Sequence, residues 1–199
     1  MKKRIKNIVC IVAIVVSMMS YANTSTSSFE KEKVKTVLTL SDVKKGHELL
    51  IKDTNLLVLY RESITKNGTY SKGFDLTALP DGEYYFELDK DVQIIMMPFT
   101  VEANQVVFNK EKEVTIYKPT VRVVDHKLFV SRLSFETQPM EVEIYYEAPF
   151  GAHTDLIFSE KIENTKIIER IYELSKQKKG DYTIIFKTQG RSFSKRLKF

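Results

Sequence analysis

Apolar and polar residues alternate over short runs along most of the chain from residue 34 onward. Runs of this kind, bounded by Gly, Pro, Asn and Asp, are typical of β-strands that have one face in a core and the other toward solvent. The clearest run is the C-terminal RSFSKRLKF, in which Phe193, Leu197 and Phe199 share one face and polar side chains share the other. Further strands are predicted at 34–40, 47–53, 106–117, 120–125, 127–135 and 142–146. The pattern therefore predicts an all-β protein.

Residues 164–177 allow two interpretations. Ile167, Ile168, Ile171 and Leu174 fit the spacing of an amphipathic helix, and they also fit a strand. We favour the strand because the segment belongs to an internal repeat of a β-rich stretch.

The repeat extends over almost half the chain. A shift of 98 residues aligns 59–101 with 157–199 without a gap, and a shift of 93 aligns 49–53 with 142–146. The second copy therefore carries about five extra residues near 148–155, which we expect in a loop. A repeat of nearly 100 residues has the size of a whole small β-domain.

One repeated feature resembles a tyrosine corner. In LPDGEY, Tyr84 follows Gly82 by two residues, and in QKKGDY Tyr182 follows Gly180 in the same way. In Greek-key sandwiches such a tyrosine bonds through its hydroxyl to backbone a few residues upstream. We expect Gly82 to take a left-handed turn, and Leu76 with Leu79 to fill the core beneath. Both tyrosines are therefore predicted to be architectural.

The order of parts in residues 156–199 resembles a known kind of module. A strand ending in FSEKI is followed by a strand closing on YELS, the Gly-Asp-Tyr corner, a hairpin through 188–190 and a basic-apolar terminal strand. The segment is similar to immunoglobulin-like modules of exported Bacteroidetes proteins, both type IX secretion C-terminal sorting domains and short secreted proteins of unknown function. It departs from the sorting-domain pattern, which begins with Asn-Pro after an aromatic residue, where this chain has FETQPMEVEI.

With the repeat, the resemblance implies two tandem immunoglobulin-like (Greek-key) β-sandwich domains. We expect them at residues 30–118 and 119–199.

The N-terminus has the features of a secretory signal peptide. Four basic residues precede an apolar run at 8–19, and small residues lead up to Ala22. A membrane anchor is the alternative, but a span needs roughly 20 apolar residues and this run is shorter. We expect residues 1–22 to be removed and 23–29 to form a flexible leader. The mature chain would then have no transmembrane span, and it would reside in the periplasm, at the cell surface or outside the cell.

Removal of the signal changes the charge balance. Residues 1–22 hold four of the 31 Lys and Arg and none of the 26 Asp and Glu, which leaves 27 against 26, a formal charge of +1. A nucleic-acid partner is not expected, because phosphate binding needs a basic stripe and both signs are interspersed here. The single cysteine, Cys10, lies in the signal, so packing rather than disulfides must stabilise the mature chain.

Nothing in the sequence predicts an enzyme. His47, His126 and His153 have no metal-ligand spacing on one element, and we expect them to be solvent-exposed turn residues. No nucleophile elbow, phosphate loop or calcium loop is present in the sequence. We predict no catalytic, cofactor-binding or metal site, and no cofactor.

One surface stands out. Residues 92–101 are apolar on both faces, with Ile94 and Met96 where the second copy has serines, and Leu57 stands where it has an aspartate. Either the other module or the hairpin expected at 105–117 covers this row, or it binds a protein partner. The sequence thus favours a non-catalytic exported binding module. The alternative is that the second module serves as a sorting or surface-anchoring signal.

Overall fold

The computed structural model describes residues 35–149 and 153–199. These residues form fifteen β-strands and two single-turn 3-10 helices, and none of them lies in an α-helix. The all-β prediction is confirmed. The predicted signal peptide and leader lie outside the described residues, as does the centre of the predicted loop insertion, 150–152.

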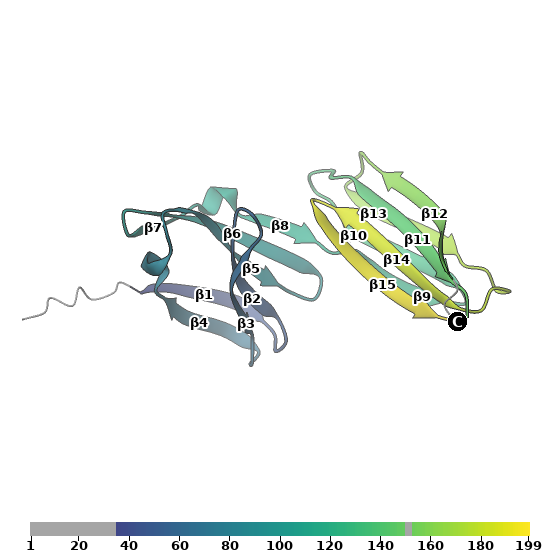
Figure 1. Cartoon of the computed structure of the whole chain (residues 1–199), viewed down its shortest axis with the longest axis horizontal. Coiled ribbons are helices and arrows are strands. Elements are labelled where there is room, and N and C mark those ends of the chain that lie inside the picture. Colours follow the sequence, from purple (N-terminus) through teal and green to yellow (C-terminus); the bar gives the residue numbers. More distant parts are fainter. Residues whose placement is uncertain (1–34, 150–152) are drawn as a thin grey trace, which may run out of the picture. The chain divides into compact units, whose positions relative to one another are not determined.

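Strands β1 to β8 form the first sandwich (Figure 1). Their bounds are β1 Thr36–Val43, β2 Glu48–Asp53, β3 Val58–Ser63, β4 Gly68–Phe74, β5 Gly82–Asp89, β6 Gln93–Glu102, β7 Gln105–Phe108 and β8 Val114–Tyr117, with 3-10 turns at Leu76–Ala78 and Lys110–Lys112. One sheet consists of β1 and β4, and the other has the order β3-β2-β5-β6-β7 with β8 also paired to β6. All pairings are antiparallel.

Strands β9 to β15 form the second sandwich. Their bounds are β9 Thr120–Val124, β10 Lys127–Leu133, β11 Met140–Glu147, β12 Thr154–Ile162, β13 Ile167–Glu173, β14 Asp181–Thr188 and β15 Arg191–Lys198. The two sheets have the orders β13-β10-β9 and β12-β11-β14-β15. The chain changes sheet after β10, β12 and β13, which is the connectivity of a Greek-key sandwich.

Each sandwich has its own hydrophobic core. All buried members of the first core lie between Leu38 and Val101, and all those of the second lie between Leu128 and Phe186. Phe86 and Phe99 are almost fully buried in the first core, as Tyr182 is in the second. Burying apolar area stabilises by about 25 cal/mol per Å², so each module has its own source of stability.

The two sandwiches repeat one strand plan. Strands β2 and β3 pair with a bulge at Leu59, and β11 and β12 pair with a bulge at Ile157, 98 residues later. Strand β13, Ile167–Glu173, lies where the same shift places β4. The strand interpretation of residues 164–177 is therefore confirmed over its central part.

Both tyrosine corners are present. The Tyr84 hydroxyl donates a hydrogen bond to the carbonyl oxygen of Pro80 at 2.9 Å, and the Tyr182 hydroxyl donates to that of Lys178 at 3.3 Å. The acceptor lies four residues upstream in each case, as the repeat predicts.

The two corner glycines differ. Gly180 has φ +151, and a Cβ there would lie 2.4 Å from the carbonyl oxygen of Glu147. Gly82 is not in the left-handed region, so that prediction is wrong. In the first copy the carboxylate of Asp81 accepts the N–H of Ala103, and the chain enters β5 at Gly82 without a positive φ.

The hairpin expected at 105–117 is also corrected. Strand β7 pairs with the second half of β6 and β8 pairs with the first half, and the two are separated by a 3-10 turn. They extend the edge of the sheet because β6, at ten residues, is long enough to pair with both in turn.

Candidate functional site

The central strands of the large sheet in the first sandwich are buried on both faces. Leu50, Tyr85, Ile94 and Ile116 are buried but belong to neither hydrophobic core. They alternate along their strands with core residues such as Phe86, so they lie on the opposite side of the sheet. We call this side the outer face; it also carries Lys52, Glu87, Asp89 and Met96. The prediction that a strand apolar on both faces is covered on both is confirmed for residues 92–101 and is wrong for residues 55–60, where Leu57, Val58 and Leu59 are exposed.

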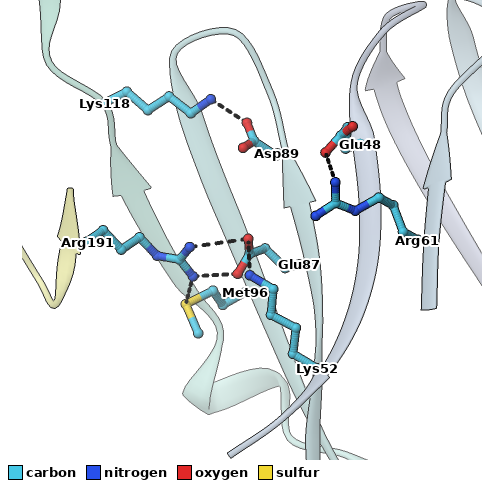
Figure 2. Close-up of polar contacts among 8 residues, drawn as sticks. All are labelled: Glu48, Lys52, Arg61, Glu87, Asp89, Met96, Lys118 and Arg191. Carbon is cyan, nitrogen blue, oxygen red and sulfur yellow. Dashed lines mark hydrogen bonds and ion pairs between the residues drawn. The ribbon is translucent and has the colours of Figure 1, made fainter. Parts of the chain in front are cut away.

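A buried carboxylate lies at the centre of the outer face. The Glu87 side chain is only 4% exposed, and Arg191, the first residue of β15, donates to both of its carboxylate oxygens (Figure 2). Lys52 donates a further hydrogen bond at 2.9 Å from Nζ to Oε1. A buried charge is tolerated only when it is paired and hydrogen-bonded, and Glu87 meets both conditions. Arg191 thereby links the second sandwich to the first.

These cations control the ionisation of Glu87. Burial alone raises the pKa of the carboxyl, but hydrogen bonds from Arg191 and Lys52 outweigh burial and hold the pKa below its usual value. The carboxylate is therefore fully charged at neutral pH, and it is already occupied by two donors.

Ion pairs that are more exposed to solvent surround this centre. Lys118 pairs with Asp89, and Arg61 lies 3.9 Å from Glu48 (Figure 2). Pairs that remain in contact with solvent stabilise a protein little, typically by about 0–1 kcal/mol. The buried pair of Glu87 and Arg191 is thus the main polar contact of the outer face.

A groove of about 540 Å³ runs along this contact. Its apolar wall includes Ile94, Ile116 and Phe193, and the three cations on its wall, Lys52, Lys118 and Arg191, are all engaged by carboxylates. The cationic groups of the groove are therefore already paired within the chain.

The residues predicted for a partner surface are not brought together. Ile94 is 3% exposed, and Met96 is half-buried with its sulfur 3.6 Å from the Arg191 guanidinium. Leu57 is 60% exposed in the turn before the edge strand β3. Ile94 and Met96 are therefore covered to different degrees, whereas Leu57 is exposed.

Leu57 belongs to an exposed aliphatic row, Leu56–Leu59. One carboxylate oxygen of Asp53 accepts the N–H groups of Asn55 and Leu57 at 2.9 and 2.8 Å, which fixes the turn. Leu56 has φ +67, a conformation that costs a residue other than glycine about 1–2 kcal/mol. The turn thus presents aliphatic side chains to solvent from a fixed and strained backbone.

The second sandwich has the same feature. Leu156, Ile157 and Phe158 on the edge strand β12 are all more than 40% exposed. This row was not predicted, although the run LIF beside the loop insertion was visible in the sequence and aligns with Val58–Tyr60 under the shift of 98.

The histidines do not form a site. His47 is buried, which corrects the expectation of exposure, because its Nδ1 accepts the N–H of Lys44 at 3.0 Å inside the β1–β2 turn. His126 is also not exposed as expected, because it is half-buried with its ring stacked on Phe199; His153 is exposed, as predicted. Within residues 35–149 and 153–199, no group of His, Cys, Asp and Glu could hold a metal ion. The same residues contain no helix suited to crossing a membrane.

No protein-family model matches the chain, and no curated protein sequence matches it. Two solved structures that it resembles are the BSP domain of a biofilm-associated protein and the FN1–FN3 domains of chicken CNTN1. The first is 12% identical with a TM-score of 0.27, and the match covers 83% of this chain and 27% of that one. The second is 13% identical with a TM-score of 0.21, covering 82% and 60%.

The chain thus spans less than two thirds of either structure. The sandwich fold described above rests on its own sheets, cores and tyrosine corners.

Proposed function

We propose that this chain is a non-catalytic, exported β-sandwich protein that binds a partner protein along its edge strands. The observation that carries the proposal is the exposed aliphatic row of Leu57, Val58 and Leu59 on one edge, together with its counterpart at Leu156–Phe158. Ile94 and Met96 are left out of this surface because the outer face is covered.

Edge strands suit this role for a physical reason. A strand at the edge of a sheet has backbone N–H and C=O groups free to pair with an added strand. Such pairing supplies affinity, and side chains beside the edge supply specificity. Strands β3 and β12 are both edge strands, and aliphatic side chains beside them would be buried by an incoming segment. The expected partner is therefore an extended, apolar protein segment.

The test is capture of partners from envelope extract by the mature chain, residues 23–199, with quantitative mass spectrometry. The variant replaces Leu57 with Asp, the residue of the second copy, and Leu59 with Thr. The control is Val37→Ser, because Val37 is 66% exposed on the other sheet. We expect the variant, and not the control, to lose at least one captured protein. Capture of the same proteins by both variants would contradict the proposal.

A second candidate function is sorting by the second module. It is supported by the separate core of that module, which allows it to be moved as a unit, and by the order of its strands. A reporter fused upstream of residues 119–199 in a strain with type IX secretion tests it. Surface delivery is the expected result, and retention in the periplasm would rule it out.

A further inference from the structure

Strand β15 is an edge strand, whereas its counterpart in the first sandwich is not. Within the described residues, β15 pairs with β14 and with no other strand. Under the shift of 98 its counterpart is β6, which pairs with β5 on one side and with β7 and β8 on the other. The same edge of the same strand plan therefore receives added strands in the first sandwich.

The backbone of β15 presents hydrogen-bonding groups along this edge. The N–H and the C=O of Phe199 both bond to Gly180 at 3.1 Å, which makes these two residues a hydrogen-bonded pair. In an antiparallel ladder such pairs alternate with residues whose N–H and C=O point away from the neighbouring strand. Ser194, Arg196 and Lys198 are the alternate residues, so their backbone groups point toward the free edge.

The first sandwich shows how such groups are used. Pro98 is the counterpart of Arg196, and its carbonyl oxygen accepts the N–H of Asn109 at 3.0 Å, just after β7. A proline has no N–H to offer to an added strand, whereas an arginine has one. At this position β15 therefore offers a donor that the paired edge of β6 lacks.

Side chains along the free edge are basic. Lys195 and Lys198 are exposed on opposite faces of β15, and neither takes part in an ion pair within the described residues. The nearby carboxylates of Asp181 and Glu147 are both bonded to Arg196, at 2.6 and 3.0 Å. Strand β15 itself contains no acidic residue. An added strand would therefore meet two lysines whose charge is not neutralised by an ion pair.

These lysines make a second copy of the same edge a poor partner. Pairing of β15 with β15 of another molecule would bring two basic strands together, and charged side chains on edge strands are a common protection against such pairing. Carboxylates on an added strand would instead be attracted, because oppositely charged side chains that lie opposite each other stabilise a strand pair. The charge of the edge thus indicates an acidic partner.

We propose that the free edge of β15, residues 194–198, binds an extended acidic segment of a partner protein as an added antiparallel strand. The residues opposite Lys198 and Lys195 are then three positions apart, and carboxylates there would pair with the lysines. The residue opposite Leu197 should be apolar, because Leu197 is half-buried against the second core. The segment therefore has an acidic residue, an apolar residue, any residue and an acidic residue, in that order. This site is separate from the aliphatic rows beside β3 and β12, and it takes a different class of segment.

Fluorescence anisotropy with the chain of residues 23–199 tests the proposal. The probe is the labelled peptide Val-Glu-Val-Thr-Glu-Thr-Val, which places its glutamates opposite Lys198 and Lys195. The control peptide has Gln in place of both Glu. We expect the probe to bind and the control to bind about tenfold more weakly, because the charge pairs are lost. Equal binding of the two peptides, or no binding of the probe up to about 1 mM, overturns the proposal.

The repeat supplies a variant that removes one outward N–H. Arg196→Pro introduces the residue of the first copy where the N–H points away from β14, so the ladder to β14 is kept. Arg196→Gln is the matched control, because it removes the same charge and keeps the N–H. Relative to this control, Arg196→Pro should weaken probe binding at least about tenfold, since the added strand loses a backbone hydrogen bond and meets the proline ring. Equal binding by the two variants, with both folded in thermal unfolding, overturns strand addition.

A charge exchange tests the lysines without altering the backbone. Lys195→Glu with Lys198→Glu should lose the probe and should bind the peptide in which Lys replaces both Glu. Leu57→Asp with Leu59→Thr should bind the probe as the original chain does, because it alters the edge at β3. Loss of the probe by the variant at β3, or failure of the exchanged charges to bind each other, overturns the proposal.

Discussion

At the scale of single residues, two adjacent tyrosines differ in whether the hydroxyl makes a hydrogen bond. Tyr84 and Tyr85 are both buried on β5, but only the Tyr84 hydroxyl has a partner; within the described residues that of Tyr85 has none. Tyr84→Phe should therefore lower the free energy of unfolding by about 1–2 kcal/mol, because the Pro80 carbonyl loses its donor. Tyr85→Phe removes an unpaired hydroxyl and should be neutral or slightly stabilising. Equilibrium unfolding in denaturant measures both, and equal losses would contradict the tyrosine-corner interpretation.

The corresponding change in the second copy should have a smaller effect. The bond from Tyr182 to Lys178 is 3.3 Å long, against 2.9 Å in the first copy. Long hydrogen bonds are weaker, so Tyr182→Phe should cost less than Tyr84→Phe, within about 1 kcal/mol.

Glu87 makes the stability of the folded protein depend on pH. Its pKa is lower in the folded protein than in the unfolded chain, so its stabilising effect is present above the ordinary pKa of glutamate and is lost as pH falls through the lower folded pKa. Unfolding measured at several acidic pH values should show a shallower loss of stability for Glu87→Gln than for the original chain. Glu83→Gln, an exposed change on the same strand, should follow the original chain. Parallel curves for all three proteins would argue against this role of Glu87.

At the scale of elements, the corner glycines make a matched pair. Gly180 has φ +151, and a Cβ there would lie 2.4 Å from the carbonyl oxygen of Glu147. A Cβ at position 82 would lie 3.5 Å from the Tyr84 ring, which is an ordinary contact distance. Gly180→Ala should cost about 2–4 kcal/mol, and Gly82→Ala should cost less than about 1 kcal/mol. Thermal unfolding of both variants tests the difference, and a tolerated Gly180→Ala would show that the β14 corner can rearrange.

The strands and turns also show which features of the fold could be predicted from the sequence. Alternation predicted most of the strands, because a strand with one buried face has a period of two residues. The repeated Gly-x-Tyr pattern predicted the tyrosine corners, and the repeat together with the family resemblance predicted the two sandwiches. These patterns could not predict that β7 and β8 share one edge of β6, or that His47 is buried in a turn. Those features depend on pairing and backbone hydrogen bonds between segments.

The candidate site was predictable only in part. The double-sided apolar pattern at Ile94 and Met96 indicated a covered face, but nothing in the sequence joined Glu87 to Arg191, 104 positions away. Burying a charge costs free energy unless a partner of opposite charge lies beside it. The alternation of apolar and polar residues does not show which distant residues form such a pair.

At the scale of the whole molecule, the outer face predicts what happens when the second sandwich is removed. A shortened chain ending at Lys118 loses Arg191 and the wall of the groove formed by residues 189–193. Ile94 and Ile116 are then left without that cover, and Glu87 keeps only Lys52 as a cationic partner. Exposed apolar patches of this kind promote association. The shortened chain should therefore self-associate and bind more of a hydrophobic dye than the chain of residues 23–199.

Replacing Ile94 and Met96 with the serines of the second copy should reverse the association of the shortened chain. Ile94→Ser with Met96→Ser should reduce dye binding and association of the shortened chain, because it then carries the polar row of Ser192 and Ser194. In the full chain the same change should destabilise, because Ile94 is 3% exposed there and its burial would be lost. A shortened chain that remains monomeric and free of dye would mean that the long side chains of the first sandwich, such as Arg61 and Lys52, already cover the outer face.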